Sequence, residues 1–196
     1  MIMTRGKIQP ETKVIRKVLG FINNLHPKEL QKANKEFQAT QEAQSAKDDT
    51  TYYSGFLSYF LLQRKIKGAT PMEYALLFPL DFFTKNDRKI IRNFVEYNDS
   101  LFQVVHINRK DYLIKNVIDS KKYLIKTIDF PNLLKVNDYI SALIVKSQKG
   151  SYFFYGNVRA YSKENGEELK KYVLKNIKKI KPRHYPEIEW EIDKQE

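Results

Sequence analysis

The sequence predicts an α+β protein: a helical N-terminal half followed by a small five-stranded antiparallel, barrel-like sheet and a C-terminal helix. As far as Asn98, apolar residues recur at three- and four-residue steps, which is the period of an amphipathic helix. After Asn98 they alternate with polar residues and are mostly β-branched or aromatic, which is typical of strands. We therefore expect a helical domain over 1–98, a barrel-like domain with a basic helix over 99–184, and an acidic tail over 185–196.

Three helices are expected in the first third of the chain. In the segment 11–25, Val14 and Val18 begin an apolar stripe at helical spacing. The segment 27–46 is rich in Gln, Lys and Glu, so it should be helical with a wide solvated face. The segment 52–66 is the most apolar, but its apolar run of about eleven residues is too short to cross a bilayer.

Two shorter helices are marked by capping signals. Thr70 precedes Glu73 by three positions. The Thr70 hydroxyl oxygen can therefore accept a hydrogen bond from the Glu73 amide, while the Glu73 carboxylate accepts one from the Thr70 amide. Thr84 and Asp87 have the same spacing and predict a weaker capping box. The first of these helices should end before the next proline, and the second should reach the end of the helical half.

The β half should contain five short strands joined by turns. The expected strands are 101–107, 112–117, 123–128, 139–145 and 152–159. Their number and size indicate a small barrel of SH3-like or OB-like size. A last helix is expected over 167–180, with Leu169, Val173 and Ile177 on its apolar side.

The composition excludes several classes of protein. The chain has no cysteine, which removes thiolate zinc sites, iron–sulfur clusters and cysteine nucleophiles. His26, His106 and His184 lie in different elements without the spacing of a metal site, so we expect no metal and no cofactor. No catalytic motif is present, and we expect a protein that is not an enzyme. A nuclease or nucleotide-acting hydrolase is the less favoured alternative.

The start of the chain carries no secretory signal. Its basic residues are not followed by an apolar run of roughly 7 to 15 residues, which such a signal needs. We therefore expect a cytoplasmic protein that does not interact with membranes.

Five short motifs follow one another over about residues 54–160. The motifs are GATPME (68–73), SLFQV (100–104), LIKNV (113–117), LKVND (134–138) and YFF (152–154). This order resembles an uncharacterised prokaryotic family, many members of which carry a cysteine-rich SEC-C zinc motif. The SEC-C cysteines are absent here, and Asn116 and Asn137 stand where an acidic residue and a glycine are expected. The resemblance implies the helical-then-β layout and no catalytic residue.

The charge of the chain favours a polyanionic partner. Lys and Arg number 35 against 23 Asp and Glu, which gives a net charge of +12. An excess of this size favours nucleic acid as a partner, although a solvated basic face that only keeps the protein in solution remains the alternative.

The basic residues gather on the last helix and in the hairpin turns. One face of the helix is almost purely cationic, and three turns each carry lysine or arginine. If the strands form a meander, the second and fourth turns meet at one end of the sheet and bring Lys121, Lys122 and Lys149 together. The candidate nucleic-acid-binding residues are Arg109, Lys110, Lys121, Lys122, Lys149, Lys171, Lys175, Lys178, Lys179, Lys181 and Arg183.

Together these patterns predict a non-enzymatic RNA-binding factor. Its expected partner is structured RNA or the ribosome, with a ribosome-associated role in translation regulation or hibernation. The alternative is a protein-interaction adaptor or dimerisation module, with a homodimer as the simplest case. In that alternative the Gln- and Glu-rich second helix forms the partner surface, and the positive charge only steers encounter.

Overall fold

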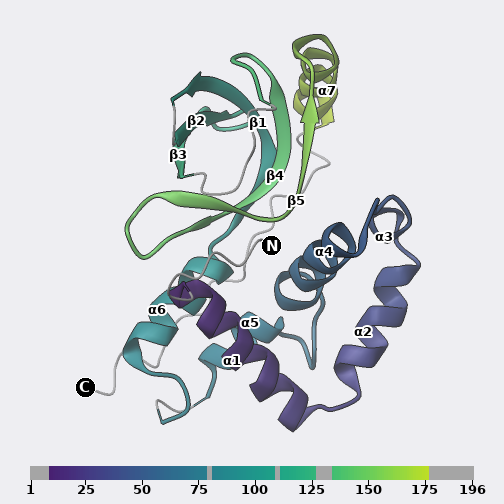
Figure 1. Cartoon of the computed structure of the whole chain (residues 1–196), viewed down its shortest axis with the longest axis vertical. Helices are drawn as coiled ribbons and strands as arrows, with labels where there is room; N and C mark the ends of the chain where they lie inside the picture. Colours follow the sequence, from purple (N-terminus) through teal and green to yellow (C-terminus); the bar gives the residue numbers. More distant parts are fainter. Residues whose placement is uncertain (1–8, 79–80, 109–110, 127–133, 177–196) are drawn as a thin grey trace.

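The chain folds into a helical half and a β-barrel that lie against each other (Figure 1). The computed structural model describes residues 9–78, 81–108, 111–126 and 134–176. The helices before the first strand are α1 (Pro10–Leu25), α2 (Glu29–Gln38), α3 (Gln41–Gln44), α4 (Asp49–Leu62), α5 (Pro71–Leu76) and α6 (Lys85–Val95). They are followed by β1 (Asn98–Ile107), β2 (Asp111–Asn116), β3 (Lys122–Lys126), β4 (Tyr139–Lys146), β5 (Tyr152–Tyr161) and α7 (Lys163–Asn176).

The change from helix to strand falls at Asn98, as the sequence predicts. Among the described residues between positions 11 and 94, no strand of a sheet is present, and Ile66 and Ala69 form an isolated bridge. The predicted α+β class is therefore confirmed.

Both predicted capping boxes form. Thr70 accepts the Glu73 amide at 3.3 Å, and the Glu73 carboxylate accepts the Thr70 amide at 2.6 Å, which fixes the start of α5. Thr84 and Asp87 make the same pair of bonds at the start of α6. Buried Arg88 donates to the carbonyl oxygens of Leu76 and Phe78 at the end of α5, so the two helices are held together end to start.

The predicted second helix is divided into α2 and α3. Thr40 lies between them, and its hydroxyl accepts the Ala43 amide at 3.2 Å as the cap of α3. Arg64, just after α4, pairs with Glu29 at 2.8 Å and with Glu36 at 2.7 Å, both on α2. The hydrogen bond from Arg64 lowers the pKa of Glu36 below its ordinary value, so the ion pair fixes α2 against the end of α4.

The five strands form a closed barrel in the order β1–β2–β3–β5–β4. Four of the contacts are antiparallel, and β3 meets β5 in parallel at Ile125 and Tyr152. This is the strand order of an OB-fold barrel. The sheet is thus mostly antiparallel, as expected, with one parallel contact, and the meander on which the predicted turn cluster depended does not form. Because β4 pairs with both β1 and β5, the free edge of β3 pairs with the free edge of β5. This parallel contact closes the barrel.

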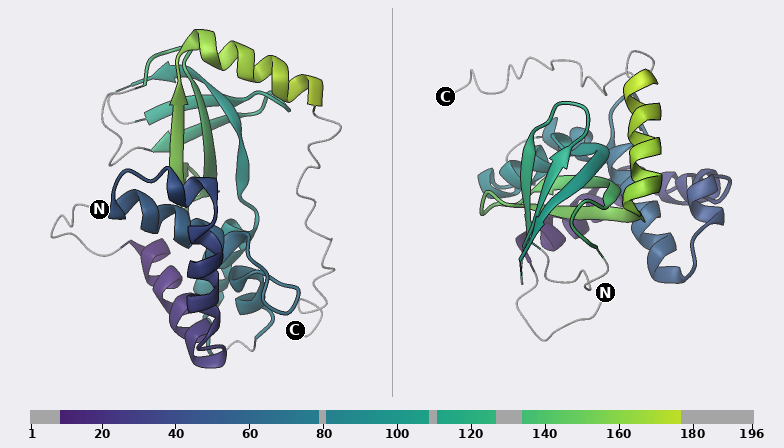
Figure 2. Two further views of the ribbon diagram at one scale, coloured as in Figure 1. Left: turned by 90° about the vertical axis from the view of Figure 1, so that its right-hand side faces the viewer. Right: turned by 90° about the horizontal axis from the view of Figure 1, so that it is seen from above.

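The barrel and the helices share an apolar core through the outer face of β4 and β5. Inside the barrel, Ile114 and Ile125 are fully buried. On the outside, Val145 and Tyr155 pack into the core of the helical half, and the Tyr155 ring lies 5.1 Å from that of Phe94. The helical half therefore covers the β4–β5 side of the barrel (Figures 1 and 2).

A bulge in β5 brings the barrel backbone against α4. Gly156 lies at the bulge with φ of +78°, and a Cβ there would lie 2.9 Å from Cβ of Ser58. The next residue, Asn157, donates to the Glu42 carboxylate at 2.9 Å. Only glycine meets both demands at position 156, the left-handed backbone and the close approach of α4.

Replacing Gly156 by alanine should destabilise the protein by about 1–3 kcal/mol, because the new methyl group strains the backbone and overlaps Ser58. The matched control is Gly20→Ala on α1, where a Cβ meets nothing within 4 Å. That change should stabilise by roughly 0.5–1 kcal/mol through helix propensity. Urea denaturation measures both, and equal stabilities of the two variants would contradict the tight contact.

Replacing Glu36 by glutamine should weaken the dependence of stability on acid. The folded pKa of Glu36 is lowered, so its ionised form stabilises the protein above the ordinary value of 4.5, and this contribution is lost as pH falls through the folded pKa. Unfolding measured from neutral pH down to about pH 3 tests this. The Glu168→Gln control removes an exposed carboxylate of α7 and should keep the wild-type profile.

Candidate nucleic-acid interface

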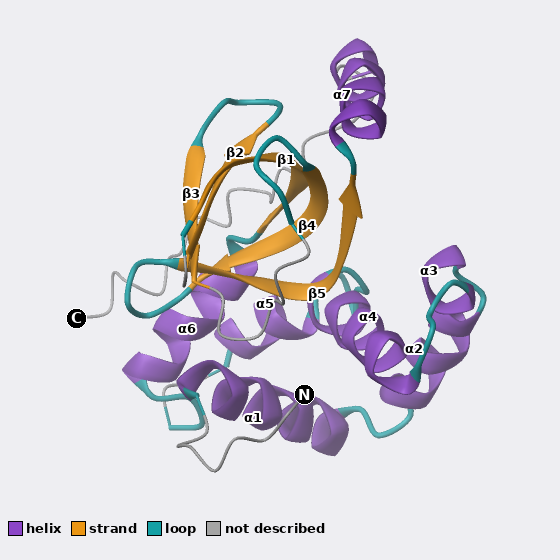
Figure 3. Cartoon of the chain, turned by 45° about the horizontal axis from the view of Figure 1, so that its top comes forward, coloured by secondary structure: helices purple, strands orange, loops and turns teal. Residues whose placement is uncertain are grey.

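The outer face of β2 and β3 is the part of the barrel that no described helix covers (Figure 3). Tyr112 and Ile114 point into the barrel, so strand alternation places Lys115 on the outside. Lys115 lies directly opposite Lys122 on the neighbouring strand β3. On the other neighbouring strand, β1, it lies opposite Gln103. Two lysines thus stand side by side on an open surface.

These two lysines differ from Lys121 in their pairing with carboxylates. Within the part of the chain that the structure describes, no carboxylate pairs with Lys115 or Lys122. Lys121, in the preceding turn, lies 3.5 Å from Asp119 and is 72% exposed. Like charges directly opposite in a sheet are destabilising, so this arrangement has a cost that an anionic ligand would relieve.

Helix α7 is attached to the barrel by its first turn. Gly166 is buried against the ring of Tyr139, and a Cβ there would lie 2.6 Å from Cβ of Tyr139. The Tyr139 hydroxyl donates to Glu167, whose pKa this bond lowers, and Lys170 lies 3.3 Å from the same carboxylate. The helix therefore begins at Lys163, four residues before the predicted start at 167.

The rest of the described α7 is mostly exposed. Gly166 is its one buried residue among those described, and Leu174 is 41% exposed. Lys171 and Lys175 are exposed on the same helix, as the sequence predicts for its basic face. The expected apolar stripe is half-buried at Leu169 and Val173, and its continuation from 177 onward lies outside the described residues.

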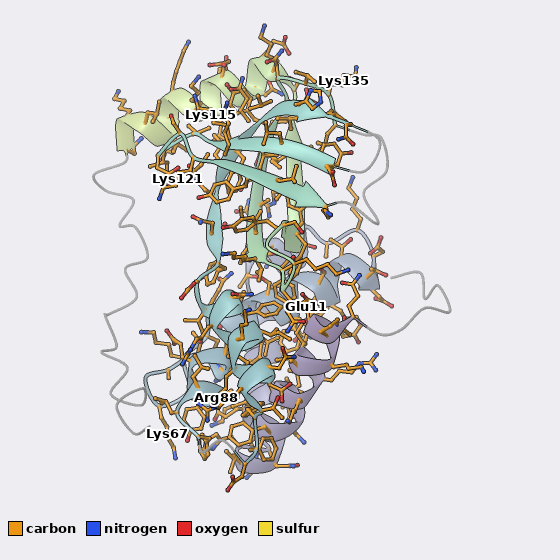
Figure 4. The ribbon with its side chains drawn as sticks, turned by 90° about the vertical axis from the view of Figure 1, so that its left-hand side faces the viewer. Glu11, Lys67, Arg88, Lys115, Lys121 and Lys135 are labelled. Carbon is orange, nitrogen blue, oxygen red and sulfur yellow. The ribbon has the colours of Figure 1, made fainter. Side chains whose placement is uncertain are left out.

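The basic residues of α7 and of the β2–β3 hairpin lie at one end of the molecule. Figure 2 shows α7 across the end of the barrel that points away from the helical half, and Figure 4 shows Lys115, Lys121 and Lys135 at that end. We call this region the distal basic surface. Its members are Lys115, Lys121, Lys122, Lys135, Lys171 and Lys175.

Lys115 and Lys135 were not among the predicted residues, which lie in turns and in or next to the last helix. For Lys115, the alternation of the motif LIKNV was the available signal, because its neighbours Ile114 and Asn116 are buried. Nothing local marked Lys135, whose position comes from the fold of the segment before β4.

The expected cluster of Lys149 with Lys121 and Lys122 does not form. Gln148, in the β4–β5 turn, donates to Glu11 through its backbone and to Asn86 through its side chain, so this turn lies on the helical half. Figures 3 and 4 show it apart from the β2–β3 turn. The reason is the register. Asn98, the first residue of β1, pairs with Ile144, so the β4–β5 turn extends past the start of that strand.

The remaining candidate residues lie outside the described part of the chain. These are Arg109, Lys110, Lys178, Lys179, Lys181 and Arg183. Of the eleven candidates, the structure thus places Lys121, Lys122, Lys171 and Lys175 at one end and Lys149 at the other.

Comparison with known proteins adds no relative. No family model, no curated protein and no solved structure matches the chain. The resemblance to the uncharacterised prokaryotic family stays a prediction.

The described residues offer neither a metal site nor a membrane span. They contain no group of three or more His, Asp or Glu side chains that could hold a metal ion. None of the described helices is long and apolar enough to span a membrane.

Replacing Gly166 by alanine should detach α7 from the barrel, because the added methyl group overlaps the Tyr139 ring. Hydrogen exchange of the α7 amides should accelerate while that of β1 and β2 stays unchanged. Asn165→Ala, at the exposed neighbouring position, is the control and should exchange like wild type. Unchanged exchange in the Gly166 variant would show that α7 is held by other contacts.

Proposed function

We propose that this protein is a non-enzymatic RNA-binding factor that uses the distal basic surface to contact the phosphates of structured RNA. Ribosomal RNA is the first target to test, since it is abundant, folded and polyanionic. The proposal includes a cytoplasmic, ribosome-associated role in translation regulation or hibernation.

The observation that carries the proposal is the pair Lys115 and Lys122. These two adjacent ammonium groups have no carboxylate partner among the described residues and repel each other. A phosphate bound between them would attract both and offset this repulsion. Lys171 and Lys175 extend the positive surface along α7 at the same end of the molecule.

The barrel type supports the same proposal. OB-fold barrels bind oligonucleotides on the face of their second and third strands, which is the face left open here. This argument is an analogy of fold, and the lysines of the site supply the chemistry.

The binding test compares two variants with the same loss of charge. The first replaces Lys115, Lys122, Lys171 and Lys175 by glutamine. The control replaces four exposed lysines of the helical half, namely Lys13, Lys28, Lys35 and Lys47. Affinity for a synthetic RNA hairpin is measured between roughly 50 and 200 mM salt, where each phosphate contact contributes about 0.7–0.9 to the slope of log affinity against log salt.

The distal variant should lose about three units of this slope, whereas the helical control should keep most of it. Co-sedimentation with ribosomes at low and high salt should follow the same order. Equal slopes for both variants would show that net charge alone attracts RNA. An unchanged slope in the distal variant, together with a stable dimer in gel filtration, would favour the adaptor alternative.

A further inference from the structure

A second candidate site lies in the helical half, away from the distal basic surface. The end of α1, the length of α2 and the start of α4 enclose a groove of about 590 Å³. Figure 1 shows α2 and α4 side by side on the right of the helical half, with the barrel above them. The RNA-binding proposal leaves this groove unused.

Carboxamide side chains line one wall of the groove. Gln31, Asn34 and Gln38 succeed one another along α2, and Asn23 on α1 completes the set. The Tyr52 hydroxyl donates to Oδ1 of Asn34 at 2.8 Å, which leaves the NH₂ group of Asn34 to donate to a ligand. Each carboxamide offers a donor and an acceptor, the same pair of groups that one peptide unit presents.

Rings and aliphatic groups form the rest of the lining. Pro27, Leu30 and Phe56 contribute apolar surface. Tyr53 also lines the groove and is 60% exposed, with its ring edge-on to Tyr52 at 5.7 Å. A tyrosine ring so exposed can take up an apolar or aromatic group of a ligand while its hydroxyl stays in water.

The groove carries no positive charge. No lysine or arginine is among its described lining residues, and Asp49 is the charged one. In a chain with a net charge of +12, this composition disfavours a polyanion, and the carboxamides suit a ligand with paired donors and acceptors.

The length of the amide row matches an extended polypeptide. From Gln31 to Gln38 the helix advances by about 10 Å, at roughly 1.5 Å per residue. Three residues of extended chain cover the same length, at about 3.3 Å each. We propose that this groove binds an extended, uncharged segment of a partner protein, with the carboxamides pairing with its main chain and Tyr53 packing on an apolar side chain.

The probe is a peptide selected by the protein itself. A phage-displayed library of random peptides is selected against the full chain, and the enriched sequence is synthesised and titrated. We expect a consensus with an apolar or aromatic anchor and no acidic cluster. The Tyr53→Ala and Asn34→Ala variants should each bind the peptide at least about ten-fold more weakly.

The matched control is Tyr172→Ala, which removes a tyrosine of similar exposure, 65%, from α7. It should bind the peptide like wild type, and thermal unfolding confirms that all three variants are folded. Equal binding to the Tyr53 and Tyr172 variants would overturn the proposal. Selection of acidic peptides that compete with RNA would overturn it as well, as would chemical-shift changes in the groove with maltohexaose and not with the peptide.

Discussion

The burial of the outer face of β4 and β5 against the helical half is the contact on which the rest of the structure depends. A barrel strand normally alternates between an apolar inner and a polar outer side, but β4 is apolar on both. Ile144 fills the barrel while its neighbours Leu143 and Val145 enter the core of the helices. Each half therefore buries part of its apolar surface on the other.

This contact decides which faces of the barrel are left uncovered by the helical half. With the β4–β5 side occupied by the helical half, the outer face of β2 and β3 is left without a covering helix among the described residues. Helix α7 packs on Tyr139 at that far end, so its lysines lie near those of the β2–β3 hairpin. The groove between α2 and α4 lies in the other half and has Asp49 as its charged lining residue, so the two surfaces differ in charge.

Much of the fold could be predicted because its signals are local. The strand positions follow from alternation and turns, and both capping boxes follow from pairs three residues apart. The start of α7 was missed because Asn165 and Gly166 are typical of a helix break, whereas Gly166 is required by the ring of Tyr139, far away in the sequence. A contact between residues so far apart in the sequence cannot be predicted from the local pattern.

The candidate site was harder to predict for the same reason. Lys121 and Lys122 were found because a hairpin turn is a local feature. The position of Lys149 depends on strand register, and register is set by which residues become buried across the whole barrel. The assumption of a meander therefore misplaced it, although the turn itself was correctly assigned.

The polar groups at the junction of the two halves show how the contact is organised. At its centre, the hydroxyl of Tyr155 has no hydrogen-bond partner among the described residues, and burial raises the pKa of this phenol above its usual value. A buried hydroxyl without a hydrogen-bond partner destabilises the folded state by about 1–3 kcal/mol. The packing of the Tyr155 ring against Phe94 offsets this cost. Asn157 with Glu42, and Gln148 with Glu11, bond at other points of the junction.

An apolar centre with hydrogen bonds beside it is the usual anatomy of a specific protein interface. The barrel then presents the distal basic surface in a fixed orientation to the groove between α2 and α4. Under the two proposals, an RNA bound at one end and a peptide bound in the other half would be connected through this junction.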